Sequence, residues 1–245
     1  MLGIPWLFAI AARADGWYLR SDIIWAKKNC MPESVVDRPT KSHEYVFLLA
    51  KSEKYFYDAE AVREHSVDPE GSAKRYEAPF NVGAKEVHNG RPNGAANTPG
   101  MKEFSGTRNL RSVWTIATQP TPFAHFATFP EKLVEPMIRA GSSERGACPH
   151  CGKAWARVVE KSGGTTDATG KPYTVTDLGF APACTCPAHE PVPCVVLDPF
   201  NGSGTTGKVA VRLCRSYIGV DIAREYLDGV TAERFGAGIQ MQMSL

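Results

Sequence analysis

The spacing of apolar residues predicts a helix followed by strands near the N-terminus. An apolar run begins at Pro5 and ends before Gly16, and it predicts a helix over residues 5–14. Proline suits the first turn of a helix, and glycine commonly follows the last. Three later stretches are rich in aromatic and β-branched residues, and each predicts a strand: residues 17–25, 43–50 and 54–58.

A similar pattern returns in the second half of the chain. A short ordered segment covers residues 112–116, and residues 129–141 predict a helix with Pro130 in its first turn and Gly141 at its end. Pro136 lies inside this helix and predicts a kink. The last segment predicts strand, glycine turn, helix, strand and helix, the strands over 195–198 and 217–221 and the helices over 207–213 and 224–235.

Residues 63–111 lack the core-sized apolar residues that a helix or strand would bury. Glycine, proline and asparagine are frequent instead, as in residues 89–94. Loops of this length in compact proteins are usually functional or disordered. Basic side chains are spread through the segment: Lys74, Arg75, Lys85, Arg91, Lys102, Arg108 and Arg111. We therefore expect a long irregular loop with a basic character.

The composition is that of one large globular domain, or of one domain with an inserted module. Of the 245 residues, 43% are apolar and 22% are charged, which allows a sizeable core. The net charge of +2 does not by itself indicate a strongly basic nucleic-acid-binding protein. The apolar run over residues 4–12 has no basic residues before it and is too short to cross a bilayer, so neither a signal peptide nor an anchor is expected. The seven cysteines are an odd number, which favours reduced thiols or metal ligands in a cytoplasmic protein.

Residues 202–208 fit two glycine-rich nucleotide-binding patterns at once. Gly202-Ser203-Gly204-Thr205-Thr206-Gly207 matches the dinucleotide fingerprint G-x-G-x-x-G, and Lys208 extends it to most of a phosphate-binding P-loop. The P-loop needs a Ser or Thr hydroxyl after the lysine, but Val209 stands there. Asp198 ends the preceding strand and would repel phosphates. The P-loop interpretation therefore fails in detail.

A ligand with a ribose and a positive charge, but no phosphate, fits the two acids that flank this turn. Asp221 follows Gly202 by about 20 residues and ends the next strand, where its carboxylate can accept hydrogen bonds from ribose hydroxyls. S-adenosylmethionine carries an ammonium and a sulfonium, and Asp198 would face that end, because charge-assisted hydrogen bonds to carboxylates are strong. An NAD-type dinucleotide on the same turn, and a turn that binds nothing, are the alternatives.

The stretch Asp198-Pro199-Phe200-Asn201-Gly202-Ser203-Gly204-Thr205-Thr206 resembles the cofactor motif of the DNA amino-methyltransferases, which methylate adenine N6 or cytosine N4. Residues 125–133 resemble the helix start that closes over the methionine moiety, and residues 21–29 and 38–45 resemble segments that follow the catalytic strand. The order of these segments resembles the β class of site-specific enzymes, in which target recognition lies between the catalytic and cofactor-binding halves. The resemblance covers nearly the whole chain, apart from the long loop and a cysteine-rich insert.

The resemblance implies a Rossmann-like α/β sheet with S-adenosylmethionine as cofactor and double-stranded DNA as substrate. It implies cofactor contacts from Asp198, Pro199, Phe200, Gly202, Ser203, Gly204, Thr205, Thr206, Asp221, Phe129 and Pro130. The loop at 63–111 would then recognise the target through phosphate and base-edge contacts, made by Lys74, Arg75, Lys85, Arg91 and Arg108. A merely solvated loop is the alternative.

The family's catalytic tetrapeptide, Asp/Ser-Pro-Pro-Tyr/Phe/Trp, does not occur in this sequence. In the family it holds the target amino group and stacks the flipped base. The resemblance places it before residue 5, so no catalytic residue is assigned. When the family's sheet order is imposed, strand 3 and the central strand 4 are also missing. The chain is then a fragment of a longer enzyme, one chain of a two-chain or homodimeric enzyme, or an inactive remnant that binds S-adenosylmethionine or DNA.

Four of the cysteines have the spacing of a structural zinc site. Residues 148–153 (CPHCGK) read as a zinc knuckle, and a C-x-C pair follows at 184–186. Four thiolates complete tetrahedral zinc and leave no position for water; the predicted ligands are Cys148, Cys151, Cys184 and Cys186. His150 or His189 could replace one thiolate, and uncoordinated free thiols are the alternative. The other cysteines, Cys30, Cys194 and Cys214, are expected to pack in the core or on strands.

These observations predict five segments: catalytic-half helix and strands (1–62), target-recognition loop (63–111), cofactor-closing helix region (112–144), zinc-ribbon-like insert (145–191) and cofactor-binding βαβ unit (192–245). The predicted function is S-adenosylmethionine-dependent methylation of adenine N6 or cytosine N4 in DNA, in a restriction-modification system of bacterial or phage type, by a longer or two-chain enzyme. The alternatives are the inactive remnant and an NAD-type Rossmann protein.

Overall fold

The computed structural model describes residues 2–68, 87–88, 91–92, 107–119, 128–162 and 174–231. The chain divides into two compact units. Unit 1 consists of Met1–Ala61, Arg111–Ala156 and Pro182–Leu245, and unit 2 of Val62–Leu110 and Arg157–Ala181. Each unit is therefore built from segments that are distant in the sequence.

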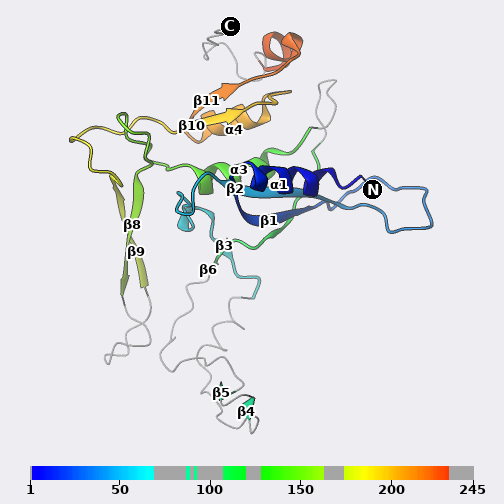
Figure 1. The fold of residues 1–245 in the computed structure, drawn as a ribbon, viewed down its shortest axis with the longest axis horizontal. Coiled ribbons are helices and arrows are strands. Elements are labelled where there is room, and N and C mark those ends of the chain that lie inside the picture. Colours follow the sequence, from blue (N-terminus) through cyan, green and yellow to red (C-terminus); the bar gives the residue numbers. More distant parts are fainter. Residues whose placement is uncertain are drawn as a thin grey trace. The chain divides into compact units, whose positions relative to one another are not determined.

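Unit 1 opens with α1 (Ile4–Ala14), which confirms the helix predicted at residues 5–14. The helix starts after Gly3, at φ 67°, and carries proline in its first turn. Trp6 packs edge-on against Tyr45 and Phe47, with ring centroids 5.2 and 5.4 Å apart. These contacts place α1 against the neighbouring sheet (Figure 1). Within the described ranges, no helix combines the length and apolar character needed to cross a bilayer.

The sheet beside α1 has three strands in the order β2–β1–β7. Strand β1 (Tyr18–Ala26) pairs antiparallel with β2 (His43–Ala50) and parallel with the short β7 (Val113–Thr115). The predicted strands at 17–25 and 43–50 are thus confirmed. Trp25 is buried and donates from its indole nitrogen to the carbonyl of Ile116 at 2.9 Å, which holds the segment after β7 beside the end of β1.

The strand predicted at residues 54–58 is wrong, because this segment has no regular secondary structure. It is tied to helix α3 (Glu131–Gly141) instead, through a 2.9 Å hydrogen bond from the backbone N–H of Asp58 to Ala140 O. The buried carboxylate of Asp58 then accepts from the Ala61 N–H at 3.2 Å, where η1 (Glu60–Val62) begins. Aromatic side chains suggested a strand, but they pack on surfaces without requiring a ladder.

The C-terminal part of unit 1 is a β–α–β unit packed on α3. Strands β10 (Val195–Asp198) and β11 (Ser216–Gly219) pair in parallel, and α4 (Thr205–Arg212) connects them. Four buried side chains of α3 and α4 form the core of this region: Val134, Ile138, Val209 and Ala210. Helix α3 runs through Pro136 without ending there. The unit confirms the predicted α/β character and the predicted strand–turn–helix–strand order.

Two further features complete this region. Buried Arg215 joins the start of β11 to the end of α3, because its guanidinium donates at 3.0 Å to both Oγ and the carbonyl of Ser142. After β11 the chain forms η2 (Tyr226–Thr231), a π-helix, where a helix was predicted over 224–235. The end of that predicted helix lies outside the described residues.

Unit 2 consists of short strand pairs. Strand β3 (Glu64–His65) pairs antiparallel with β6 (Thr107–Arg108), and β4 (Val87–His88) pairs antiparallel with β5 (Arg91–Pro92). The longer β8 (Ala156–Ser162) and β9 (Thr174–Ala181) pair within the cysteine-rich insert (Figure 1). The guanidinium of Arg157 lies over the ring of Phe180 and pairs with Asp177. These strand pairs were not predicted from the sequence.

Candidate cofactor turn and cysteine cluster

The glycine-rich turn connects the end of β10 to the start of α4. Gly202 and Gly204 have φ values of 49° and 72°, a left-handed conformation that side chains disfavour. Gly204 donates to Asn201 O at 2.9 Å, and its own carbonyl accepts the Lys208 N–H at 2.9 Å, which begins the helix. Gly202 is half-buried and Gly204 is buried, so the turn packs its backbone closely at the positive end of the α4 dipole.

Two carboxylates flank this turn from the ends of adjacent parallel strands. Asp198 is the last residue of β10, in register with Gly219, and Asp221 follows β11. The Gly202 N–H donates to Asp221 Oδ2 at 2.7 Å, and the Ala223 N–H donates to Oδ1 at 2.9 Å. Asp198 Oδ1 accepts the Phe200 N–H at 3.0 Å. The structure thus brings the two predicted cofactor acids together at one turn, each held in place by backbone.

The other predicted cofactor residues of the turn differ in exposure. Phe200 is 84% exposed, whereas Ser203 and Thr205 are buried with their hydroxyl oxygens 3.3 Å apart. Pro199 is exposed and Thr206 is half-buried. The turn therefore has a buried polar interior and an aromatic ring on its outer side.

A hydrogen bond between Asn201 and Tyr217 ties the turn to β11. It was not predicted from the sequence. The Tyr217 hydroxyl donates to Asn201 Oδ1 at 2.6 Å, and the Asn201 N–H donates to Val220 O at 2.8 Å. The pKa of Tyr217 is raised well above its usual range, mainly by burial and secondly by the negative charge of Asp198. The phenol therefore stays protonated. The only sequence signal is that a polar Tyr lies inside a strand of the cofactor unit.

The remaining predicted cofactor residues, Phe129 and Pro130, directly precede α3, and α3 itself contributes an ion-pair network. Pro130 caps the helix and Phe129 packs against the core. Glu131 Oε1 lies 2.8 Å from Lys208 Nζ, and Glu131 also pairs with Arg212 of α4. Partial burial raises the pKa of Glu131, but the two cations outweigh burial and lower it. Lys208, the P-loop lysine of the rejected pattern, is thus engaged with Glu131.

A cavity of about 520 Å³ lies in unit 1, lined mainly by apolar residues. Its walls come from β1, β2, α3 and β10, and include Trp25, Tyr45, Met137 and Val195. Of the predicted cofactor residues only Phe129 and Thr206 line it, and Asp198 and Asp221 do not. Among the described residues of its wall, Glu44 is the only charged one, so the cavity suits an apolar occupant.

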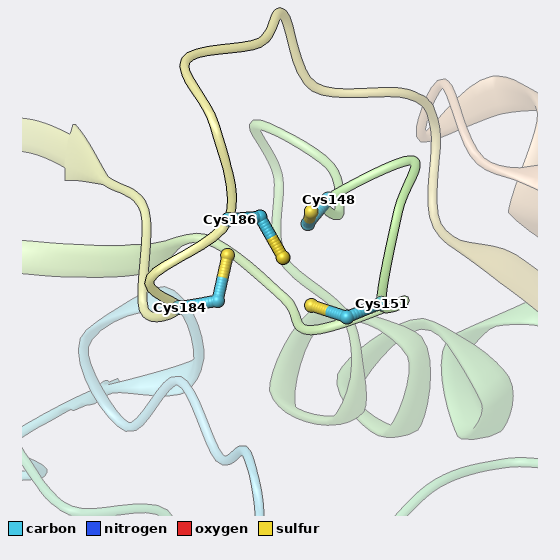
Figure 2. Close-up of side chains that lie close together, drawn as sticks. All are labelled: Cys148, Cys151, Cys184 and Cys186. Atoms are coloured by element: carbon cyan, nitrogen blue, oxygen red, sulfur yellow. The ribbon is translucent and has the colours of Figure 1, made fainter.

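The four predicted zinc ligands converge although two segments supply them (Figure 2). The sulfur atoms of Cys148, Cys151, Cys184 and Cys186 all lie within 4.8 Å of one another. The first pair sits on a tight knuckle in which Gly152, at φ 72°, donates to Cys148 O at 2.8 Å. Reciprocal backbone hydrogen bonds of 2.7 and 2.9 Å between Ala147 and Val192 tie the two ends of the insert together. Four sulfur atoms at this spacing are compatible with tetrahedral zinc.

The thiols of this cluster differ in acidity. Burial raises the pKa of Cys148, but hydrogen bonds from the backbone of Cys151 and His150 outweigh it and lower that pKa to about 6. The pKa of Cys186 is raised to about 12. The main cause is its side-chain hydrogen bond with Cys151, and burial is the second. Cys148 therefore forms a thiolate more readily than Cys184 or Cys186, whose pKa values are raised.

The alternative histidine ligands lie beside the cluster and outside this set of four. Nδ1 of His189 is 4.0 Å from Cys148 Sγ but only 2.6 Å from the carbonyl of Pro187. A carbonyl can only accept, so this nitrogen carries the proton and is not a ligand in this conformation. The ring of His150 packs edge-on against His189. His150 is exposed, whereas Nε2 of His189 is buried and has no hydrogen-bond partner among the described residues.

The predicted DNA-binding residues are only partly described. Lys74, Arg75 and Lys85 lie outside the described residues, and only the backbone of Arg91 is described, in β5. Arg108 in β6 pairs with Glu64 at 2.8 Å. Nearby, Arg63 donates to Thr107 Oγ1 at 2.9 Å and to Asn109 Oδ1 at 3.2 Å. Arg108 is thus engaged in an ion pair across the β3–β6 pair.

The DNA methylase family matches residues 3–153 and 191–233 of this chain. Type II methyltransferase M.Cfr9I of Citrobacter freundii is 36% identical over 228 residues, which cover 93% of this chain and 48% of that protein. Type II methyltransferase M.SmaI of Serratia marcescens is 34% identical over 226 residues, which cover 92% and 49%. The chain therefore spans about half the length of these relatives.

Two solved structures show a weaker similarity. PvuII DNA methyltransferase (cytosine-N4-specific) is 17% identical with a TM-score of 0.49, covering 98% of this chain and 62% of that chain. The M1.HpyAVI-SAM complex is 17% identical with a TM-score of 0.48, covering 96% and 71%. The family match does not include residues 154–190, which contain the β8–β9 pair and two of the clustered cysteines.

Proposed function

This chain belongs to the DNA methylase family, and from that premise we propose that it is the cofactor-binding part of a DNA amino-methyltransferase. Its substrate would be adenine N6 or cytosine N4 in double-stranded DNA, within a bacterial or phage restriction-modification system. The observation that carries the proposal is the turn at Gly202, which Asp198 and Asp221 flank from adjacent strand ends. This arrangement places two carboxylates, each held by backbone N–H groups, at one turn.

The charges of this turn fit S-adenosylmethionine. Each carboxylate oxygen of Asp221 accepts one backbone N–H and retains lone-pair capacity, so it can also accept from a ribose hydroxyl. Asp198 would attract the ammonium and sulfonium of the methionine end. Phe129, Pro130, Pro199, Phe200, Ser203, Gly204, Thr205 and Thr206 would complete the site. When bound, the cofactor supplies a methyl group on a sulfonium, whose positive charge makes the methyl group electrophilic.

Methyl transfer would require a segment from outside these residues. The exocyclic amino group is a poor nucleophile because its lone pair is delocalised into the base, and a flipped base must be held with that group toward the methyl donor. Positioning of this kind is worth roughly 7–11 kcal/mol in favourable cases. The sequence contains no Asp/Ser-Pro-Pro-aromatic tetrapeptide, and the chain spans about half of its relatives' length. The rest of a longer chain, a second chain or a homodimer partner would supply it, with the missing strands 3 and 4.

Target recognition would fall to the basic segment at 63–111, with Lys74, Arg75, Lys85, Arg91 and Arg108 as candidate DNA contacts. Arg108 would have to exchange Glu64 for a phosphate oxygen, which costs little because the pair is partly exposed to solvent. The absence of the tetrapeptide also favours a second candidate function, that of an inactive remnant which binds S-adenosylmethionine or DNA without transfer.

A tritiated-methyl assay on mixed-sequence duplex DNA separates the two candidate functions. We expect no detectable incorporation by residues 1–245 alone. Incorporation should appear when the half of M.Cfr9I that lies outside its match to this chain is joined to it by a flexible linker. Robust incorporation by the 245-residue chain alone would refute the need for an added segment. Cofactor binding without incorporation by the joined protein would favour the remnant.

The cysteine cluster would hold one structural zinc ion through Cys148, Cys151, Cys184 and Cys186. The four sulfur atoms are already within 4.8 Å of one another, and four thiolates leave no position for water. Cys184 and Cys186 lie in the segment that the family match passes over. The zinc site would therefore tie Cys148 and Cys151 to a segment that this chain has in addition to the family match.

A further inference from the structure

The cysteine cluster is joined by two short linkers to the elements that carry the proposed cofactor contacts. The first linker, residues 142–147, leads from the end of α3 to the first cysteine pair, and the second, residues 187–194, leads from the second pair to the start of β10. The sulfur atoms point toward one another where the two segments meet (Figure 2). Helix α3 directly follows Phe129 and Pro130, and β10 ends at Asp198. Each half of the cluster is thus continuous with one side of the proposed cofactor site.

Backbone contacts fasten the two linkers to each other. Ala147 and Val192 exchange hydrogen bonds of 2.7 and 2.9 Å, and the backbone N–H of Ser143 donates to the sulfur of buried Cys194. At Gly146, which has a φ of 116°, a Cβ would lie 2.3 Å from the carbonyl oxygen of Val192. The linkers therefore approach so closely that residue 146 has room for glycine alone.

The linkers also contact the strand pair that holds the glycine turn. The carbonyl of Cys194 accepts the Ser216 N–H at 2.9 Å, where the β10–β11 pair begins. At the end of α3, Ser142 accepts two hydrogen bonds of 3.0 Å from Arg215, the residue before β11. A separation of the linkers would therefore disturb the start of both strands that flank the turn.

A metal ion in the cluster would hold the linkers together. Residues 152–183 separate Cys151 from Cys184, and bringing the ends of a long segment together costs conformational entropy that a metal bound at both ends offsets. When the ligands meet only in the ordered chain, the free energy of metal binding becomes free energy of ordering. The four sulfur atoms lie within 4.8 Å of one another only while the two segments are together as in this structure.

We propose that the cysteine cluster is a regulatory metal site, in which bound zinc orders the two linkers and thereby raises the affinity of the glycine turn for S-adenosylmethionine. Zinc binds the state with paired linkers, because only that state brings the four thiolates together. The cofactor favours the same state, because β10 carries Asp198 and leads into the turn. By thermodynamic linkage, S-adenosylmethionine raises the affinity for zinc by the same factor. The inference rests on the proposed function for the identity of the cofactor.

Calorimetry on the 245-residue chain tests the coupling. The Kd for S-adenosylmethionine should rise by at least about fivefold when a chelator strips the zinc, and should return when zinc is restored. The affinity for zinc, measured by competition with a chromophoric chelator, should rise by the same factor when S-adenosylmethionine is present. A Kd that does not depend on zinc would overturn the coupling alone. No binding of S-adenosylmethionine by the zinc-loaded chain would refute the proposed function, and the coupling with it.

Hydrogen exchange shows whether the metal acts on the linkers and on the strand pair. Stripping should raise the exchange rates of the Val192 and Ser216 amides by about tenfold or more. The Ile24 amide, which donates to Ser112 O at 2.8 Å beside β7, should keep its rate, which shows that the rest of unit 1 stays folded. An unchanged rate at Ser216 would overturn the proposal, because the effect of the metal would then end at the linkers.

Gly146→Ala should break the link without removing a zinc ligand or a cofactor residue. Its Cβ would push Val192 away, so the variant should bind about one zinc ion per chain but keep the weak cofactor affinity of the stripped chain. Gly16→Ala is the matched control: Gly16 also has a positive φ, of 93°, but its Cβ would meet nothing within 4 Å, so the coupling should remain. A wild-type response to zinc in Gly146→Ala would overturn the role of the linkers. The measurements on the wild-type chain decide the coupling even if this variant does not fold.

Discussion

The Tyr217 hydroxyl donates a 2.6 Å hydrogen bond to Oδ1 of Asn201, and this bond ties β11 to the turn that follows β10. Asn201 is 4% exposed, so the bond is shielded from water. It fixes the residue before Gly202, whose N–H donates to Asp221. The relative position of Asp198 and Asp221, the two acids proposed to hold the cofactor, therefore depends on a tyrosine of the neighbouring strand.

Tyr217→Phe should weaken both the fold and the cofactor site. It removes the donor to a buried amide oxygen, which typically costs about 1–3 kcal/mol. We expect a lower urea midpoint and weaker binding of S-adenosylmethionine, measured by denaturation and calorimetry. Tyr18→Phe is the control. Because Tyr18 is 44% exposed, this variant should keep both the urea midpoint and the affinity for S-adenosylmethionine. Equal stability of the two variants would show that the hydrogen bond contributes nothing.

Gly219→Ala should be destabilising because the β11 backbone passes close to Asn201. A Cβ at residue 219 would lie 2.5 Å from Asn201 Oδ1 and 2.9 Å from the Tyr217 hydroxyl oxygen. Overpacking of this kind costs about 1–3 kcal/mol. Gly141→Ala, at the end of α3, meets nothing within 4 Å and should be neutral or stabilising by up to about 1 kcal/mol. Thermal melts of the two variants in parallel test this difference; a melting temperature for Gly219→Ala at or above that of Gly141→Ala contradicts it.

Asp221→Ala should reduce the affinity for S-adenosylmethionine. The loss of a charged hydrogen-bonding partner costs on the order of 1–3 kcal/mol, or about 5- to 150-fold in Kd. Asp221→Asn should not rescue binding, because an amide has one acceptor oxygen and both oxygens of Asp221 accept backbone N–H groups. Calorimetry is the measurement, with the exposed Asp37→Ala as control. Wild-type affinity in Asp221→Ala would exclude the ribose contact, and tight NAD binding would revive the dinucleotide alternative.

The cysteine cluster should retain about one zinc ion per chain after exhaustive dialysis. Cys184→Ser should abolish retention and lower the melting temperature, because the other three thiolates cannot complete the tetrahedron. Cys30 lies outside the cluster, so Cys30→Ser should keep both the metal and the melting temperature. Elemental analysis combined with thermal melts provides the readout. A metal-free wild-type chain that melts at the same temperature with and without added zinc would refute the site.

Local patterns predicted most of the elements near the cofactor turn. The apolar periodicity and glycine signals located α1, α3, α4 and β10 because helix starts, helix ends and buried strands depend on nearby residues. The strand predicted at 54–58 failed because its aromatic residues pack without a ladder, and the segment is instead held by α3 through Asp58. The β8–β9 pair was not predicted, because strand propensity depends strongly on the surroundings that a segment meets in the folded protein.

The sequence by itself determined the chemistry available to this protein: two acids around a glycine turn, two cysteine pairs, and a family motif that the family match bears out. Only the tertiary structure decided which of these groups meet. Folding brings Cys148 to Cys186, places Asp221 against Gly202, and adds the hydrogen bond between Asn201 and Tyr217. It also leaves the side chains of Val195 and Leu197 on β10 each 60% exposed. The physical reason is that contacts between residues distant in sequence depend on packing and strand order, which no local pattern specifies.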